Sequence, residues 1–311
     1  MRHLPFDRPG RFYRGNLHTH STVSDGMLDP VDVVRRYREQ GYDFLAITDH
    51  FMESFGFPVV DTRLFRDDGF TTLLGAELHG PALEHGEPWH LLAVGLPLDF
   101  PPALEGETGP AIASRAAAAG AFVGIAHPAW YSLTLDDALL VEAAHAVEIY
   151  NETTVQDNDR GESWYLSDQL GLRGRRLFAF ASDDAHFAGR PDAFGGWTQV
   201  RAKALEPEEL LAALKAGHFY SSQGPELHDI HVDDDRLHVA CSPASLIIAS
   251  GKGSRSQAAR GDGLTSGSFD LERFRDSFCR VTVIDATGKR AWSNPIWLDG
   301  GRGDVVASGL L

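Results

Sequence analysis

The chain has 311 residues, of which 43% are hydrophobic and 23% charged, and its formal net charge at pH 7 is −16. This composition is typical of a soluble globular protein with room for one large α/β domain and a smaller one. Because nonspecific binding to nucleic acid depends on lysine and arginine that neutralise phosphates, the acidic balance argues against a nucleic-acid partner.

The chain opens on MRHLPFDRPGRFYRG, which lacks the apolar core of a secretory signal peptide. No stretch of the sequence approaches the roughly 20 apolar residues that a helix needs to span a bilayer. We therefore expect a cytoplasmic protein that does not interact with membranes.

Strand and helix patterns alternate over the first two-thirds of the chain. Strand patterns cover 11–17, 42–48, 71–77, 89–95, 121–127, 146–151, 175–182 and 218–222. Helix patterns cover 30–40, between the cap Asp29 and Gly41, and then 109–119, 134–145, 160–171 and 205–217. Because crossover helices join parallel strands, this alternation predicts a parallel sheet or barrel wall, and the fully apolar runs LAIT, FVGIA and LFAFA agree.

The pattern changes near Gly224, where strand-like alternation replaces helical stripes. We read 1–223 as a barrel and 224–311 as a small antiparallel β-sandwich, with a hairpin connection at 285–288 and a mobile Gly- and Ser-rich loop at 251–268. The two cysteines, Cys241 and Cys279, both lie in this part. We expect two buried thiols, with a disulfide across neighbouring strands as the alternative.

Histidines and carboxylates recur at the ends of the predicted strands. His18 and His20 follow the first strand, and Asp184 and His186 follow a later one with the same spacing. Because side chains alternate across a strand, each pair can share one ion, and the carboxyl ends of strands are where (β/α) barrels form active sites. The candidate metal ligands are His18, His20, Asp25, His50, Glu77, His90, His127, Asp184 and His186. Imidazole and carboxylate together bind zinc, manganese or iron, and nine ligands exceed the needs of one ion.

The strings NLHTHSTVSDG, LAITDH, GAELH, HLLAVG, GIAHP and ASDDAH together resemble the polymerase and histidinol phosphatase (PHP) superfamily over about residues 14–190. The resemblance implies a distorted (β/α)7 barrel with two or three divalent metal ions at the carboxyl ends of its strands. Carried over by motif, the first metal has the ligands His18, His20, Glu77 and Asp184. Glu77 bridges to a second metal with His90 and His127, and a third has Asp25, His50 and His186. Asp25 stands where some members have histidine, so the third site departs most from the family pattern.

The strings FGGWTQVRA, LLAALKAGHFYSSQGPELHDIHVD and RVTVIDATGKRAWSNPIWL are similar to the CehA/McbA-type metallohydrolases. That resemblance implies a β-domain fused after the barrel. Named members of the group hydrolyse an aryl carbamate ester.

The leading hypothesis is a phosphoesterase that cleaves a small phosphate ester by attack of metal-bound hydroxide, since paired metals stabilise both the attacking and the leaving oxygen. Asp184 and His186 are its expected catalytic residues, together with Arg190, whose guanidinium could hold a phosphate by two parallel hydrogen bonds. The other interpretation of Arg190 is a loop salt bridge. A carbamate or carboxylic ester hydrolase is the alternative enzyme, with Trp130 and Tyr131 lining its pocket.

A non-catalytic binding or regulatory module is the third possibility, against which the complete ligand set argues. Two further residues near the predicted ligands have two interpretations each. His79 points to the same face as Glu77 and is an outside candidate for a ligand or acid, whereas Asn151 either orients substrate or a ligand or caps the end of its strand. The oligomeric state is left open.

Overall fold

The computed structural model describes residues 5–298. The strands within this range are β1 (Arg11–Asn16), β2 (Phe44–Ile47), β3 (His50–Phe51), β4 (Thr71–Ala82), β5 (Pro88–Val94), β6 (Phe122–Ile125), β7 (Ala146–Asn151), β8 (Phe178–Ser182), β9 (Trp197–Ala202), β10 (Phe219–Ser222), β11 (Leu227–Asp233), β12 (Arg236–Gly251), β13 (Ser256–Asp270), β14 (Phe278–Ile284), β15 (Arg290–Trp292) and β16 (Ile296–Trp297). The α-helices are α1 (Pro30–Glu39), α2 (Gly109–Ala118), α3 (Leu135–Leu140), α4 (Glu152–Asn158), α5 (Trp164–Leu172) and α6 (Pro207–Lys215). Short 3-10 helices cover Glu53–Phe55, Arg63–Phe65 and Leu271–Phe274.

The protein is a mixed α/β fold built on one large sheet. Its hydrogen-bonded strand order is β11-β12-β14-β15-β10-β9-β1-β2-β4-β5-β6-β7-β8. Strands β1, β2 and β4 are parallel neighbours, as are β6, β7 and β8. An isolated parallel bridge between Thr19 and Ala185 joins the segments that follow β1 and β8. The ends of these two strands, far apart in the sequence, therefore meet.

One expected parallel strand runs the other way. Strand β5 is antiparallel to both β4 and β6. Only residues 83–87 separate β4 from β5, and a parallel return needs a crossover of a dozen residues or more. As a consequence, the amino end of β5 lies beside the carboxyl end of β4.

The local signals at helix α1 act as predicted. The Asp29 side chain accepts a hydrogen bond from the Asp32 backbone N–H at 2.9 Å, and Pro30 occupies the first turn. Val33, Val34 and Tyr37 form its buried face. Helix α4 and strand β9 were not predicted, and α3 is shorter than the predicted 134–145.

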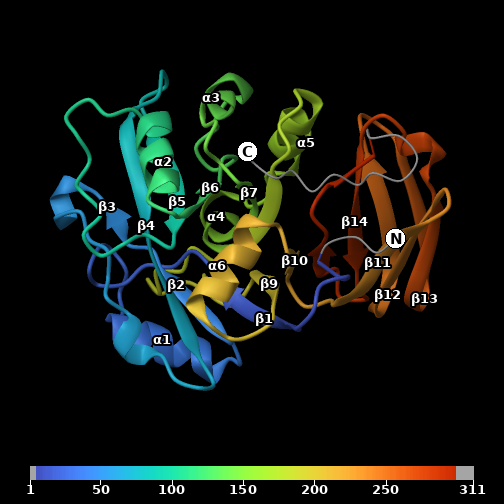
Figure 1. The fold of residues 1–311 in the computed structure, drawn as a ribbon, viewed down its shortest axis with the longest axis horizontal. Coiled ribbons are helices and arrows are strands. Elements are labelled where there is room, and N and C mark those ends of the chain that lie inside the picture. Colours follow the sequence, from blue (N-terminus) through green and yellow to red (C-terminus); the bar gives the residue numbers. More distant parts are fainter. Residues whose placement is uncertain (1–4, 299–311) are drawn as a thin grey trace.

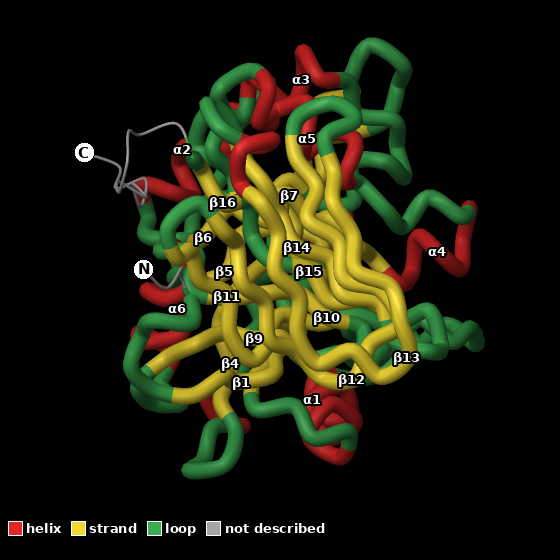
Figure 2. Tube along the Cα trace, turned by 90° about the vertical axis from the view of Figure 1, so that its right-hand side faces the viewer, coloured by secondary structure: helices red, strands yellow, loops and turns green. Residues whose placement is uncertain are grey.

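The C-terminal part is built of antiparallel strands, which stand at the right of Figure 1 in orange and red. The predicted hairpin at 285–288 joins β14 to β15 and is confirmed. The mobile loop predicted for 251–268 is wrong: most of it is β13, which pairs along β12 (Figure 2). Most side chains of β13 are exposed, so the strand is held by backbone pairing and lacks the apolar alternation that identifies a strand in sequence.

The cysteines are two free, buried thiols, as predicted. Burial raises the pKa of Cys279 to about 12. No helix within residues 5–298 is long and apolar enough to cross a membrane.

The C-terminal strands are tied to the rest of the sheet. Strand β15 pairs with β10 in antiparallel register, with Ser221 opposite Trp292. The buried Asn294 side chain accepts a hydrogen bond from the Ala179 N–H in β8 at 2.8 Å and donates to the Gly217 and Phe219 carbonyls at 3.0 and 2.9 Å. A single amide therefore satisfies three backbone groups.

Replacing Asn294 by alanine should lower the free energy of unfolding by about 3 kcal/mol, because each buried polar group left without a partner costs roughly 1–3 kcal/mol. Urea denaturation followed by circular dichroism measures the loss. The matched control is Asn158→Ala at an exposed position, which should change stability by less than about 0.5 kcal/mol. Equal stabilities of the two variants would contradict the assigned role of Asn294.

Candidate metal centre

The nine predicted ligands converge at one end of the sheet. Each belongs to at least one set of side chains whose ligand atoms lie within 4.8 Å of one another. The ligands that follow β1, β2 and β8 lie just beyond the carboxyl ends of these strands, whereas Glu77 lies within β4, five residues before its end at Ala82. His90 arrives at the same place from the amino end of β5, because that strand is reversed and His90 pairs in register with His79.

A first set is formed by His18, His20, Glu77 and Asp184. The Asp184 Oδ1 atom lies 3.2 Å from His18 Nε2 and 2.8 Å from His20 Nε2. Both of these histidine nitrogens lie 3.7 Å from Glu77 Oε2. Glu77 and both histidines are fully buried, and Asp184 nearly so.

The second carboxylate oxygen of Glu77 faces another pair of histidines. Glu77 Oε1 lies 2.8 Å from His90 Nδ1 and 3.1 Å from His127 Nε2. The two oxygens of one buried carboxylate thus face different histidine sets, which is the arrangement of a carboxylate that bridges two cations.

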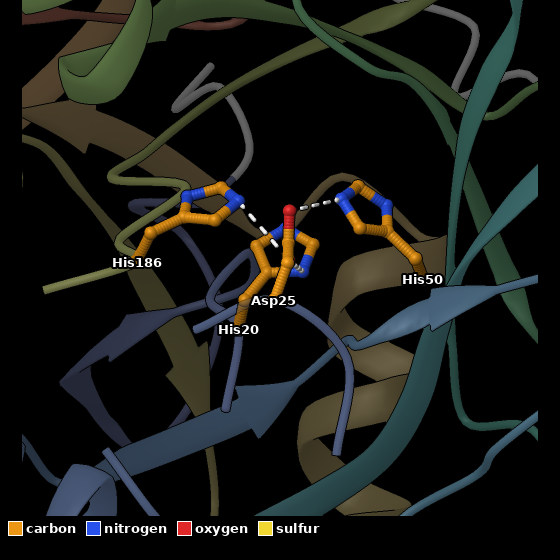
Figure 3. Close-up of side chains that lie close together, drawn as sticks. All are labelled: His20, Asp25, His50 and His186. Atoms are coloured by element: carbon orange, nitrogen blue, oxygen red, sulfur yellow. Dashed lines mark ion pairs between the residues drawn. The ribbon is translucent and has the colours of Figure 1, made fainter. Parts of the chain in front are cut away.

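The third set surrounds Asp25 and is drawn in Figure 3. Asp25 Oδ2 lies 3.3 Å from His50 Nε2, and Oδ1 lies 3.4 Å from His186 Nε2. The His20 ring lies between those of His50 and His186, with centroid distances of 4.3 and 4.2 Å. The Asp25 side chain is 45% exposed, so this set is the side of the centre that faces solvent.

Glu148 within β7 and Asn151 at its end hold the predicted ligands in place. Glu148 Oε1 lies 3.2 Å from His18 Nδ1, and Oε2 accepts a hydrogen bond from the His127 backbone N–H at 2.6 Å. The Asn151 amide donates to Glu148 at 3.0 Å and to Asp184 at 3.2 Å, and its oxygen also caps α4. A carboxylate on one ring nitrogen fixes the orientation of the other, so Glu148 directs His18 Nε2 toward the cluster. The sequence predicted no role for Glu148, because a carboxylate at a strand end has no spacing that marks it as an orienting group.

The donor set fits a divalent cation. Among the described residues, His18 Nε2 and Glu77 Oε2 are buried side-chain atoms without a hydrogen-bond partner. Leaving such atoms unpaired is costly, and a cation bound there would satisfy both. Backbone strain adds to this: His127 and Asp184 have positive φ angles of 22° and 59°, and such conformations cluster at functional sites. Histidine with carboxylate is a ligand chemistry that suits zinc, manganese and iron.

The charges in the centre set a pH dependence for cation binding. Burial lowers the pKa of His50, but Glu77 and Asp25 outweigh it and raise the pKa to about 10. Burial, His186 and His50 instead lower the pKa of His20 to about 3. Without a cation, His50 therefore carries a proton at neutral pH, whereas His20 does not.

Cation binding should release protons at pH 7, and affinity should rise with pH because a cation must displace the His50 proton. Isothermal titration calorimetry in two buffers of different ionisation enthalpy measures the number of protons released. A binding heat that is the same in both buffers would contradict the prediction.

Arg190 lies outside the ligand sets. Its guanidinium forms ion pairs with Asp157 and with Asp192, the latter at 3.3 Å. The structure thus contains the loop salt bridge that was the second interpretation of this residue, and a phosphate-binding role for Arg190 stays a prediction.

Trp130 packs edge-on against two of the ligands. Its ring centroid lies 5.5 Å from that of His90 and 5.3 Å from that of His127. The neighbouring Tyr131 is buried against the same two rings. An aromatic wall therefore closes this side of the centre.

No protein-family model and no curated protein matches the sequence. Among solved structures, the fold is similar to a two-domain protein from Bacteroides vulgatus that contains a predicted PHP-like metal-dependent phosphoesterase. The sequences are 15% identical, the match covers 91% of this chain and 94% of the other, and the TM-score is 0.49. An amidohydrolase from Chromobacterium violaceum, with bound sulfate and no metal, is 14% identical over 55% of this chain and 87% of its own, with a TM-score of 0.38. At these values the likenesses assign no function to this chain, and similarity of its C-terminal part to the CehA/McbA type stays a prediction.

Proposed function

We propose that the chain is a metal-dependent hydrolase that cleaves a small phosphate ester. The observation that carries the proposal is Glu77, whose two oxygens each face a separate set of histidines. The proposed ligands are His18, His20, Glu77 and Asp184 for one cation, Glu77, His90 and His127 for a second, and Asp25, His50 and His186 for a third. Bound zinc, manganese or iron would lower the pKa of water and stabilise charge on the attacking and leaving oxygens.

The protein side chains contribute positioning and exclusion of water. Glu148 holds the ring of His18, and Asn151 holds the carboxylate of Asp184. Trp130 covers His90 and His127. The solvent-facing set around Asp25 is the side from which a small substrate would enter.

The state of Arg190 favours a second candidate. Because two carboxylates already neutralise this guanidinium, it offers less to a phosphate than a free arginine would. Trp130 beside the ligands suits an aromatic leaving group. These two observations support a carbamate or carboxylic ester hydrolase as the alternative.

Hydrolysis of three chromogenic esters separates the candidates. The protein is stripped with chelator, reloaded with zinc, manganese or iron, and assayed with p-nitrophenyl phosphate, p-nitrophenyl acetate and p-nitrophenyl N-methylcarbamate. We expect the unaltered chain to release nitrophenol from the phosphate only when a cation is bound. The Asp184→Asn variant should release none. Release from the carbamate or acetate alone would favour the second candidate. Cation binding with no hydrolysis of any ester would support a non-catalytic module, and a chain that binds no cation would contradict both enzymes.

We also propose that the predicted division at residue 223 holds for the described residues, with 5–223 in a distorted (β/α)7 barrel and 224–298 in a β-sandwich. Residues 1–4 and 299–311 of the predicted domains lie outside the described range. The support is a separate buried apolar cluster made mostly of C-terminal residues, among them Ile230, Val239, Ile247, Phe274 and Val281.

A further inference from the structure

His79 lies inside the histidine cluster, although the nine proposed ligands do not include it. It follows Glu77 by two residues in β4, so both side chains point to the same face of the strand. The antiparallel register places it opposite His90, and the two rings meet at a centroid distance of 4.5 Å. Only 8% of His79 is exposed.

The contacts of His79 are those of a ligand. Its Nε2 atom lies 2.8 Å from His50 Nδ1 and 3.6 Å from Glu77 Oε2, and His50 Nδ1 lies 2.7 Å from the same oxygen. A divalent cation at about 2.0–2.2 Å from each of three donors holds those donors roughly 3–3.6 Å apart. The three atoms therefore need to separate only slightly to receive a cation.

His50 has a second nitrogen that faces a different set. Its Nε2 lies 3.3 Å from Asp25 Oδ2, on the solvent side, whereas its Nδ1 faces Glu77 and His79. The His50 ring therefore lies between two groups of donors. Neutral imidazole can bind a cation through one nitrogen, and both nitrogens bind at once only when the ring has released both protons to solvent as the imidazolate.

A purely structural role explains His79 less well. Among the described residues, its buried Nδ1 has no hydrogen-bond partner, so no contact on that side of the ring accounts for a histidine at this position. Of its two ring nitrogens, only Nε2 is directed at other donors. The ring orientation that leaves Nδ1 without a hydrogen bond is therefore the one that points Nε2 at Glu77 and His50.

We propose that His79 is a tenth cation ligand, which together with Glu77 Oε2 and His50 Nδ1 holds a divalent cation beside the three sets described above. This proposal rests on the proposed metal centre. It assigns to the chain one cation position more than the nine ligands provide. His50 binds either this cation or that of the Asp25 set as neutral imidazole, and both only as an imidazolate whose two ring protons have passed to solvent.

Cobalt titration of the full chain tests the proposal without an assay of activity. Bound cobalt is counted by elemental analysis after gel filtration, and visible absorption reports the number of nitrogen donors. His79→Gln and His79→Phe should each bind one equivalent fewer than the unaltered chain, or bind it at least tenfold more weakly, with a changed spectrum. The matched control is His85→Gln, in the exposed loop between β4 and β5, which should bind as the unaltered chain does.

The outcomes separate this inference from the proposed function. An unaltered chain that binds no cobalt contradicts the metal centre itself. Normal cobalt binding and an unchanged spectrum in His79→Gln overturn the tenth ligand alone, because glutamine keeps a hydrogen bond to His50 but is a poor ligand. That result would make His79 a residue that only positions His50. Thermal unfolding in chelator shows whether each variant is folded. If His79→Phe is unfolded, cobalt binding by His79→Gln alone tests the tenth ligand.

Discussion

Replacing Glu77 by glutamine should lower kcat/KM for the hydrolysed ester by at least about 10³-fold, with little loss of folded protein. Glutamine keeps the size of the side chain but offers one neutral carbonyl oxygen where the carboxylate offers two charged oxygens to two histidine sets. A 10³-fold loss corresponds to about 4 kcal/mol of transition-state stabilisation, within what paired metals supply. Steady-state kinetics on the reloaded protein measures the effect.

The comparison variant is Asp25→Asn, at the 45% exposed edge of the centre. It alters only the solvent-facing set, so we expect a smaller loss, about tenfold. Bound metal measured in both variants should fall further in Glu77→Gln. Near-normal kcat/KM in Glu77→Gln would mean that this carboxylate does not bridge two cations.

Replacing Asp183 by alanine should lower the free energy of unfolding by about 4 kcal/mol, whether or not cations are present. The fully buried carboxylate accepts hydrogen bonds from the Tyr37 hydroxyl at 2.7 Å and from the backbone N–H groups of Phe194, Gly195 and Gly196 at 2.9–3.0 Å. Removing it leaves four donors without this acceptor, of which the Tyr37 hydroxyl and the Gly196 N–H are buried and the other two half-buried. A buried donor left unpaired costs roughly 1–3 kcal/mol before the structure relaxes. Chemical denaturation in chelator measures the loss.

Two control variants test whether the loss of stability is specific to Asp183. Asp184→Asn, one residue later, should match the unaltered chain in chelator and lose only the stabilisation that added cations provide. Asp68→Ala removes an exposed carboxylate and should cost less than about 0.5 kcal/mol. If Asp183→Ala unfolds at the same denaturant concentration as Asp68→Ala, the four hydrogen bonds do not hold the loop after β8.

The ligands could be predicted because their spacing repeats at successive strand ends. His18 with His20 and Asp184 with His186 have the two-residue spacing of a strand. The structure brings the two pairs together, with His20 Nε2 2.8 Å from Asp184 Oδ1. An orienting role was one of the two interpretations of Asn151, and its hydrogen bond to Asp184 agrees with it. The contacts of Glu148 could not be predicted, since they depend on which side chain lies across the sheet. The salt bridge of Arg190 joins residues 33 positions apart in the chain, and no local pattern reports such a pairing.

In the fold, too, features that depend on neighbouring residues could be predicted, and features that depend on residues distant in sequence could not. Caps and apolar stripes identified α1 and the buried strands, because these signals act within one element. The reversed direction of β5 was not predicted, because the predicted strands 71–77 and 89–95 leave eleven residues between them. The structure extends β4 to Ala82, and only this extension shortens the connection to residues 83–87. Strand β13 was predicted as a loop because its stability comes from backbone pairing with β12, which leaves no apolar stripe in the sequence.

Asn294 has a consequence for how the chain can be divided or recombined. Its amide binds the N–H of Ala179, in the strand that leads to Asp183 and Asp184, and β15 covers the edge of β10. A truncation at residue 223 would leave that edge bare and strip hydrogen bonds from the strand beneath the metal ligands. An exchange of the C-terminal strands for unrelated ones would therefore disturb β8, unless the replacement supplies the three hydrogen bonds that the Asn294 amide makes.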